Sequence, residues 1–395
     1  MRPLAEHIAE AVSLVSELPV ERVPLIDGMD RVLAKDVVAI VDGPAFDNSA
    51  MDGYAVRTAE AVAGCTLPVS ADIPAGPGLP APLAPGTAMR IMTGAPLPQG
   101  ADAVVPVEAT DGGVEWVTFA ESAVAGAHVR RRGEDVRVGD VVVAAGVLLG
   151  SWQLSAAASV GAVEIAVRRK PRIAVLATGD ELVPPGTVPG PGQIIDSNST
   201  LLAALVKGAG GVPVVLPRAG DTPEAVIEAL DGVDADLIVT AGGASVGAYD
   251  PVKAALADRG VSFRAVAMQP GKPQGIGTFQ GIPIACLPGN PVSVAVTFSV
   301  VVGAMVRTML GAPEPLMPAA PAAVGWASPH GRAQFVPAVF DPNGALRPAT
   351  SGGSRSHLVA SLAKGRVLAV VPAEVDEVLP GDTVSFMLSH LEILS

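Results

Sequence analysis

Two glycine-rich turns in this sequence have the composition of an anion-binding site. Each turn follows a short apolar run and precedes a helix-like run that begins at a proline. Glycines let the backbone approach a ligand, and the N–H groups at a helix start favour negative charge. Either turn alone could be an ordinary loop between a strand and a helix, but a lysine between them favours one shared anion site. The residues concerned are Gly242, Gly243, Ser245, Gly247, Asp250, Lys272, Pro288, Gly289, Asn290, Pro291 and Ser293.

A third polar segment, residues 44–55, contains carboxylates that could bind a hard cation. Its short polar side chains can hydrogen-bond to their own backbone, which indicates a structured loop and not a linker. Asp47 and Asp52 are oxygen ligands of the kind that hard cations prefer, although an Asx-rich turn without a ligand is the alternative. Residues 128–135 form a charge run with three arginines. This run could be a solvated turn, or it could hold a phosphate-rich ligand or an acidic residue of a partner subunit.

The elements that would position these turns are those of an α/β domain. Strand-like and helix-like runs alternate from residue 170 to residue 311, which predicts a doubly wound α/β domain. Thr178–Glu181 end one apolar run in a polar turn, and Thr222 and Pro223 begin a helix as N-cap and first residue. Both glycine-rich turns should therefore lie at the carboxyl end of one sheet, where open α/β sheets bind ligands.

The rest of the chain predicts helices and two β-rich regions. Residues 4–18 have apolar side chains at helical spacing. Short β-like runs alternate with proline and glycine from residue 61 to residue 121, which predicts a small, mainly β domain inserted in the chain. A Pro- and Ala-rich linker at 312–321 precedes a region that we expect to be a small β-barrel or sandwich. Ser151 can cap a helix, but Gln153 is too close to it for a full capping box.

The composition excludes several classes of protein. Of 395 residues, 49% are hydrophobic and only 3% aromatic, so core material is ample and an aromatic base-stacking surface is excluded. A net charge of −13 argues against a general binder of nucleic acid or acidic membranes. Two cysteines cannot form a thiolate metal cluster. The acidic first residues are not those of a signal peptide. The use of only two cysteines fits a reducing cytoplasm. The uncharged run 292–306 is shorter than the roughly 20 residues of a membrane span, so we expect a buried helix there.

Seven motifs, in order along nearly the whole chain, resemble those of the molybdopterin molybdotransferases, the MoeA family, which includes the gephyrin E domain. The motifs are Asp47–Ala55, Met92–Ala95, Arg132–Asp135, Thr178–Leu182, Gly242–Gly247, Pro270–Pro273 and Leu287–Ser293. The resemblance implies that adenylylated molybdopterin and molybdate react, with Mg²⁺, to give molybdenum cofactor, AMP and water. It also implies an elongated homodimer whose active cleft lies between the α/β domain of one subunit and the inserted β domain of the other.

The resemblance further implies four domains per chain. Residues 1–42 and 130–169 would form a discontinuous, elongated N-terminal domain used in dimerisation, and residues 43–129 the inserted, mainly β domain. Residues 170–311 would form the α/β molybdopterin-binding domain, which resembles that of molybdopterin adenylyltransferases, and residues 320–395 a C-terminal β-barrel.

Site roles follow from the same resemblance, residue by residue. The expected catalytic residues are Asp52, Thr93, Glu181, Asp221 and Asp250. Mg²⁺ would be bound by the four carboxylates among them, Asp52, Glu181, Asp221 and Asp250. Molybdate, a tetrahedral dianion, would contact Lys272, Ser293, Arg332 and Ser356. Asp52 and Thr93 would reach in from the partner subunit. The pterin substrate would contact Thr178, Gly179, Asp180, Gly242, Gly243, Ser245, Gly247, Lys272, Pro288, Gly289, Asn290, Pro291 and Ser293.

One position departs from the family pattern. Gln269 stands where members often carry a second lysine, which predicts weaker molybdate binding unless Arg332 or Lys253 compensates. Two other functions remain alternatives: a molybdopterin adenylyltransferase, which the α/β domain alone would suggest, and a non-enzymatic cofactor-binding scaffold. The expected partners are a second copy of the chain, a molybdopterin adenylyltransferase, and molybdoenzyme apoproteins or chaperones, with no nucleic acid and no membrane.

Overall fold

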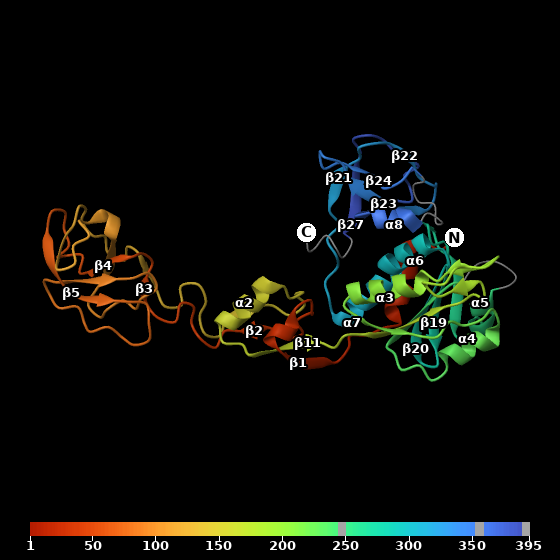
Figure 1. Ribbon diagram of the computed structural model, residues 1–395, viewed down its shortest axis with the longest axis horizontal. Helices are drawn as coiled ribbons and strands as arrows, with labels where there is room; N and C mark the ends of the chain where they lie inside the picture. The colour runs from red at the N-terminus through yellow and green to blue at the C-terminus, as the bar shows by residue number, and fades with distance from the viewer. Residues whose placement is uncertain (244–249, 352–358, 389–395) are drawn as a thin grey trace.

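The computed structural model describes residues 1–243, 250–351 and 359–388 of the chain. The molecule is elongated, with a small β unit at one end, a narrow middle section, and an α/β unit with a second β unit at the other end (Figure 1). The chain leaves the middle section for the small β unit and later returns, so two separate stretches of sequence build the middle section. The predicted combination of α/β and β units in one chain is confirmed.

The small β unit is a five-stranded sheet with hydrophobic clusters on both faces. Its strand order is β7-β4-β6-β5-β8, and Tyr54 and Ile91 are fully buried in different clusters. A glycine is required at position 53, where β4 begins, because a Cβ there would lie 2.1 Å from the Val105 carbonyl oxygen. The bounds are β3 (Asn48–Ser49), β4 (Gly53–Val56), β5 (Thr66–Ile73), β6 (Ala88–Ile91), β7 (Ala103–Pro106), η2 (Val107–Ala109), β8 (Trp116–Thr118) and β9 (Val129–Arg130).

The middle section consists of two antiparallel strand pairs and a short helix. β1 pairs with β11 and β2 with β10, so strands from before and after the small β unit hold this section together. Gly150, and not Ser151, is the N-cap of α2, because the Gly150 N–H donates to Gln153 Oε1 at 3.0 Å. The bounds are β1 (Val20–Pro24), η1 (Leu25–Gly28), β2 (Val37–Val38), β10 (Val141–Val143), α2 (Ser151–Ser159) and β11 (Glu164–Arg168).

The α/β unit contains a six-stranded sheet with the order β15-β12-β16-β20-β19-β17. The first four strands are parallel, whereas β19 is antiparallel to both of its neighbours. Ile173 and Val175 of β12 face one hydrophobic cluster, and Ala174 and Leu176 face the other, as expected for a strand buried on both faces. The bounds are β12 (Arg172–Ala177), β13 (Leu182–Val183), β14 (Ile194–Ile195), β15 (Val212–Val215), β16 (Leu237–Ala241), β17 (Val261–Ala265), β19 (Pro273–Phe279) and β20 (Ile282–Leu287).

Helices cover both faces of this sheet, which confirms the doubly wound arrangement. α1, α3, α6 and α7 pack on one face, and α4 and α5 on the other. The stretch Pro291–Leu310 is long and apolar enough to cross a membrane, but 83% of its most apolar window is buried, as in a core helix. The bounds are α1 (Leu4–Ser13), α3 (Asn198–Gly208), α4 (Pro223–Leu230), α5 (Pro251–Leu256), α6 (Pro291–Thr297), the π-helical η3 (Phe298–Val302) and α7 (Gly303–Leu310).

The C-terminal unit is a partly closed β-barrel. One of its strands, β18, comes from the segment of the chain that lies within the α/β unit. β18, which directly precedes β19, pairs in parallel with β23 of the barrel. The sheet continues from β23 to β25, β27 and β21, and a bridge between Ala322 and Leu346 links its two ends. The bounds are β18 (Met268–Gln269), β21 (Ala319–Pro321), β22 (Trp326–Ala327), β23 (Ala333–Phe340), β24 (Leu346–Pro348), α8 (Val359–Lys364), β25 (Val367–Val371), β26 (Glu377–Val378) and β27 (Thr383–Leu388).

Candidate active site

Polar turns meet at the carboxyl edge of the parallel strands. Thr178, which follows β12, forms a parallel bridge with Ala219, which lies beyond β15. The Gly179 N–H donates to the Ala219 carbonyl oxygen at 3.3 Å, and the Asp180 N–H donates to Asp221 Oδ2 at 3.0 Å. The structure therefore brings the Thr178 turn and the Asp221 turn together.

Glycine at position 242 lets two further turns come close to the first. Its φ is +97°, and a Cβ would lie 2.9 Å from the Thr178 carbonyl oxygen. The Gly242 N–H donates to the Leu287 carbonyl oxygen at 3.3 Å, and a Cβ on Gly289 would lie 3.4 Å from the Gly242 Cα. At the start of α3, Asn198 Nδ2 donates to the Gly289 carbonyl oxygen at 2.7 Å. Main-chain groups therefore line this edge, because side chains do not fit there.

A buried hydroxyl borders the same cluster of turns. Thr178 is 6% exposed, and its Oγ1 has no hydrogen-bond partner among the residues that the structure describes. A Cβ on Gly242 would lie 2.9 Å from this oxygen. A buried polar atom without a partner costs about 1–3 kcal/mol. A polar group of a ligand would offset that cost.

The helix after the first glycine-rich turn, α5, begins at Pro251, directly after Asp250. Asp250 Oδ1 accepts from the Lys253 N–H at 3.3 Å, which makes Asp250 the N-cap of α5. The Lys253 N–H also donates to the Gly243 carbonyl oxygen at 3.2 Å. Asp250 thus has a structural role besides the ligand role expected from the sequence. Ser245 and Gly247 lie outside the described residues.

The second turn leads from β20 into α6. Pro288 and Gly289 follow the strand, Asn290 is the N-cap, and Pro291 is the first helical residue. Ser293 lies in the first turn of this helix and is 4% exposed. The N–H groups at a helix start attract anions. The turn therefore adds donors to the same edge of the sheet.

The predicted oxyanion residues lie where the α/β unit joins the barrel. Lys272 follows β18, Arg332 precedes β23, and these two strands pair in parallel. Lys272 is exposed and Arg332 is half-buried. The loop before Lys272 also contacts α6, because a Cβ on Gly271 would lie 2.5 Å from Thr297 Oγ1. Ser356 is outside the part of the chain that the structure describes.

The predicted magnesium ligands do not assemble within one chain. Glu181 and Asp221 are exposed at the sheet edge, and a Cβ on Gly179 would lie 2.3 Å from Glu181 Oε2. Asp52 precedes β4 in the small β unit, at the opposite end of the molecule (Figure 1). In residues 1–243, 250–351 and 359–388, no group of three or more His, Cys, Asp and Glu side chains is placed to hold a metal ion.

Asp52 and Thr93 form a pair at the ends of adjacent strands. β4 and β6 are antiparallel, with Gly53 opposite Ile91, so the residues just beyond them meet. Asp52 Oδ1 accepts from the Thr93 N–H at 2.7 Å and from Thr93 Oγ1 at 2.8 Å. The backbone hydrogen bond first, and then the hydroxyl, lower the pKa of Asp52 below its usual value. The carboxylate is therefore ionised and exposed, as a cation ligand should be.

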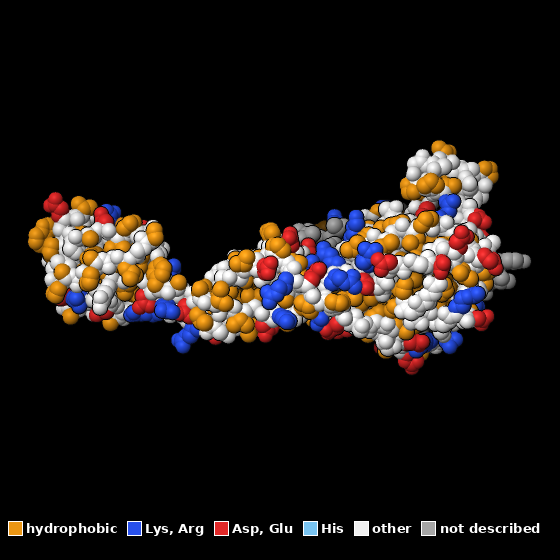
Figure 2. Space-filling model, turned by 90° about the horizontal axis from the view of Figure 1, so that it is seen from below, with side chains coloured by type: hydrophobic (Ala, Val, Ile, Leu, Met, Phe, Trp, Pro, Cys, Tyr) orange, Lys and Arg blue, Asp and Glu red, His pale blue; other side chains and the backbone are white. Residues whose placement is uncertain are grey.

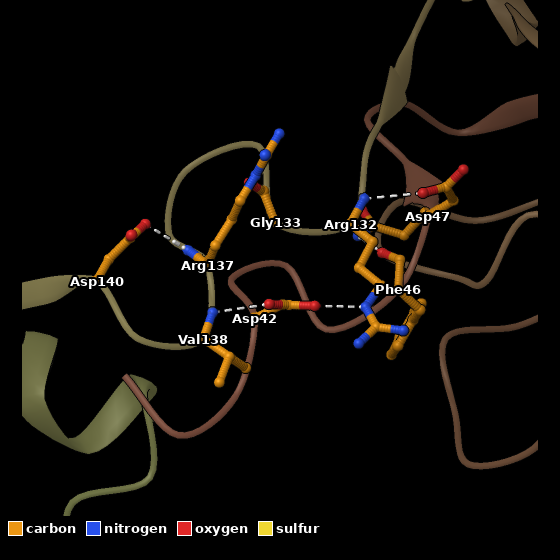
Figure 3. Close-up of polar contacts among 9 residues, drawn as sticks. Asp42, Phe46, Asp47, Arg132, Gly133, Arg137, Val138 and Asp140 are labelled. Carbon is orange, nitrogen blue, oxygen red and sulfur yellow. Dashed lines mark hydrogen bonds and ion pairs between the residues drawn. The ribbon is translucent and has the colours of Figure 1, made fainter. Parts of the chain in front are cut away.

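The arginine run is paired within the chain. Asp47 accepts from Arg131 Nη1 and from the Arg132 N–H, both at 2.8 Å. Arg132 Nε donates to Asp42 Oδ2 at 2.5 Å, and Asp42 Oδ1 accepts from the Val138 N–H at 2.9 Å (Figure 3). Two arginines of the run, Arg131 and Arg132, are therefore paired with aspartates of their own chain. The sequence did not indicate this pairing because the partners lie 85 and 90 positions apart.

Three stretches of the chain match known domain families. Residues 2–161 match the MoeA N-terminal region (domains I and II). Residues 174–308 match a probable molybdopterin binding domain, and residues 319–389 match the MoeA C-terminal region (domain IV).

A relative that spans the whole chain decides the family. Molybdopterin molybdenumtransferase 2 of Mycobacterium tuberculosis is 45% identical, over 96% of this chain and 98% of the relative. This chain belongs to the molybdopterin molybdenumtransferase family. Molybdopterin molybdenumtransferase 1 of the same organism is 35% identical, over 99% of this chain and 100% of that relative.

Solved structures of the family extend the likeness to the whole fold. The crystal structure of the molybdopterin biosynthesis moeA protein from Pyrococcus horikoshii has a TM-score of 0.86 at 26% identity and covers 98% of this chain. A second structure of the moeA protein from this organism has a TM-score of 0.79 at 30% identity, with 98% of both chains covered.

Replacing Thr93 with valine should raise the pKa of Asp52 part of the way to its usual value, because one of its two hydrogen bonds is lost and the backbone one remains. Titration of the carboxyl carbon by NMR measures this change. Asp111 is a matched control in the same β unit, since the Thr118 N–H is the main cause of its own lowered pKa. Equal pKa shifts at Asp52 and Asp111, or no pKa shift at Asp52, would show that the Thr93 hydroxyl does not lower the pKa of Asp52.

Proposed function

We propose that this protein inserts molybdenum into molybdopterin, with adenylylated molybdopterin and molybdate as substrates and AMP as a product. The observation that carries this proposal is the convergence of main-chain turns after β12, β16 and β20. Those turns are linked through α6 to the loop that carries Lys272. Backbone donors combined with a lysine suit a phosphoanhydride and an oxyanion. The names of the full-length relatives support molybdenum transfer as the chemistry.

The turns at the sheet edge would hold the phosphate groups of the substrate. Main-chain N–H groups around Gly242 and Gly289 can donate to phosphate oxygens at a place where no side chain intervenes. The buried Thr178 hydroxyl can donate as well. Because the protein has a net charge of −13, these local donors, and not its overall field, must attract the anion.

The junction of the α/β unit and the barrel would hold molybdate. Lys272, in the loop after β18, and Arg332, in the turn before β23, would supply positive charge, and Ser293 would supply a hydroxyl from α6. Gln269 lies on β18, opposite Gln334 of β23. A neutral amide at position 269 leaves this site with two cations, Lys272 and Arg332.

Exposed carboxylates would hold Mg²⁺. Glu181 and Asp221 lie at the sheet edge, and Asp52 is kept ionised by Thr93 in the small β unit. These are hard oxygen donors and fit the ion. When bound, Mg²⁺ would neutralise charge on the phosphoanhydride oxygens. Within the chain itself, the Thr93 hydrogen bonds orient Asp52 toward this task.

A second copy of the chain would complete the site. Asp52 and Glu181 lie in units at opposite ends of one elongated molecule (Figure 1). A symmetric pair of chains, arranged side by side in opposite directions, would place the small β unit of each near the α/β unit of the other. Both sites of such a dimer would be identical.

The middle section offers the surface for this dimer. Trp152 is 85% exposed, Ile26 is 80% exposed and Val163 is 79% exposed. The Leu25 N–H donates to the Val163 carbonyl oxygen at 3.0 Å, which places Ile26 and Val163 next to each other. Figure 2 shows hydrophobic side chains exposed over this section. An apolar surface of this kind marks an interaction site, and a second copy is the occupant that the divided site requires.

The proposed reaction also implies which proteins supply its substrate and receive its product. A molybdopterin adenylyltransferase would supply the adenylylated substrate, and molybdoenzyme apoproteins or their chaperones would receive the product. The cytoplasm is the compartment in which these partners would be met.

The wild-type protein should release AMP from adenylylated molybdopterin in a reaction that needs both molybdate and Mg²⁺. Glu181→Gln should lower this rate by at least about 100-fold, because a metal ligand is lost. Glu228→Gln, on the exposed side of α4, is the control and should be unaffected. Stable substrate binding without AMP release would favour a scaffold, and consumption of ATP would favour an adenylyltransferase.

Trp152→Glu should convert the dimer to a monomer, because a charge would be buried in the apolar interface. Sedimentation velocity or light scattering measures the mass. Leu79→Glu is the matched control, since Leu79 is 89% exposed but lies in the small β unit. A Trp152→Glu protein that stays dimeric would show that the chains associate through another surface.

A further inference from the structure

His7 is a buried ionisable residue that the proposed reaction does not use. It lies on α1 and is 0% exposed. Burial is the main cause that lowers its pKa to about 4, so the imidazole is neutral at neutral pH. Its Nε2 lies 3.1 Å from Gln274 Oε1, on a strand 267 positions away in the sequence. A histidine in such a place connects α1 to the sheet.

Gln274 extends this contact to the Lys272 loop. Its Nε2 donates to the Gly271 carbonyl oxygen at 2.7 Å. An amide nitrogen only donates, so the amide oxygen faces His7 and must accept. His7 therefore carries its proton on Nε2. A buried chain of two hydrogen bonds therefore connects His7 through Gln274 to Gly271, the residue that precedes Lys272.

The loop also lies close against α6. Gly271 has a φ of +105°, and a Cβ there would lie 2.5 Å from Thr297 Oγ1. Ser293 lies four positions before Thr297, on the same face of that helix. The position of Gly271 therefore sets where Lys272 stands relative to Ser293.

The N-terminal segment is hydrogen-bonded to the stretch of chain just before this loop. The Arg2 N–H donates to the Ala265 carbonyl oxygen, and the Ala267 N–H donates to the Arg2 carbonyl oxygen, both at 2.8 Å. The Val266 N–H, between them, donates to the Lys272 carbonyl oxygen at 2.7 Å. α1 itself packs against the hydrophobic cluster that α6 and α7 line. The N-terminus lies at this junction in Figure 1.

We propose that His7 and Gln274 are positioning residues for the oxyanion site, which fix the Lys272 loop against α6 by hydrogen bonds from the N-terminal helix. The proposal rests on the proposed function, because it takes Lys272 as a molybdate ligand. Neither residue touches the substrate. Their loss should weaken binding of molybdate and leave the turnover number at saturating molybdate nearly unchanged.

Three variants test this proposal in the full-length protein. His7→Phe keeps the ring but removes the proton that Gln274 accepts. His7→Gln is the conservative variant, since its amide nitrogen can replace the ring Nε2 as donor. Thr308→Val is the control, because it removes a side-chain hydrogen bond to the Ala304 carbonyl oxygen in the same helical layer, away from the loop.

Two measurements are made on each variant. The first is hydrogen exchange of the Val266 amide, which reports the Lys272 carbonyl contact without any substrate, with the Val239 amide of β16 as the reference for overall stability. The second is the molybdate concentration that gives half-maximal AMP release. Loss of one buried hydrogen bond corresponds to about a tenfold effect on each.

In the expected result, the Val266 amide of His7→Phe exchanges about tenfold faster relative to Val239. The molybdate concentration that gives half-maximal AMP release rises about tenfold. His7→Gln and Thr308→Val stay close to wild type. The proposal is wrong if His7→Phe matches Thr308→Val in both measurements. Should His7→Phe fail to fold, Gln274→Met removes the donor to Gly271 and carries the same expectations. A wild-type protein without molybdate-dependent AMP release would refute the proposed function, whereas the exchange measurement would still decide whether His7 positions the loop.

Discussion

The close approach of main-chain turns at one edge of the α/β sheet is the constraint on which the rest of the structure depends. A Cβ on Gly242 would lie 2.9 Å from the Thr178 carbonyl oxygen, so only glycine lets the turns after β12 and β16 meet. Where these turns meet, main-chain groups and the buried Thr178 hydroxyl line the edge of the sheet. This local arrangement explains how a protein with a net charge of −13 could bind an anionic substrate. Positive charge is then needed at only a few points, and we propose that Lys272 and Arg332 supply it.

The second constraint is the length of the molecule. Asp52 is held ionised by Thr93 at one end, whereas Glu181 and Asp221 lie at the other. The chain enters the small β unit near Asp42 and Asp47 and leaves it near the arginine run. Hydrogen bonds from Arg131 to Asp47 and from Arg132 to Asp42 join these two connections (Figure 3). Single exposed ion pairs contribute little to stability, but this group links both crossings and so orients the unit that carries Asp52. The divided site that we propose needs such orientation, because the partner subunit would have to meet the Asp52 carboxylate in a fixed place.

Sequence patterns predicted the α/β unit well and the long-range contacts poorly. Alternating apolar runs predicted the doubly wound sheet, because buried parallel strands are almost wholly apolar. The antiparallel β19 was not foreseen, although the tight turn at Gln280 and Gly281, both with positive φ, joins it to β20. The helix predicted to reach Leu18 ends at Ser13, because the Leu18 N–H donates to the Met309 carbonyl oxygen and fixes an irregular segment. Tertiary contacts of this kind leave no local signal.

In the candidate site, too, local features could be predicted from the sequence and long-range contacts could not. Glycine-rich turns and the helix cap at Thr222 could be predicted because their causes lie within a few residues. The N-cap role of Asp250 was not predicted, because the sequence indicated only a ligand role for it. The Gln274 link between His7 and Gly271 could not, since it joins distant segments through buried amide and imidazole groups. The roles of Glu181, Arg332 and Asp52 came from the family resemblance, because spacing alone does not bring residues from three units together.

Mixing two inactive variants tests most directly the central claim that two chains share each site. Asp52→Asn and Glu181→Gln subunits are combined, and molybdate-dependent AMP release is measured. If each site takes Asp52 from one chain and Glu181 from the other, every mixed dimer has one intact site, and random mixing restores about a quarter of wild-type activity. If mixed dimers form and no activity returns, the two carboxylates do not act across subunits, and the account of the site is wrong.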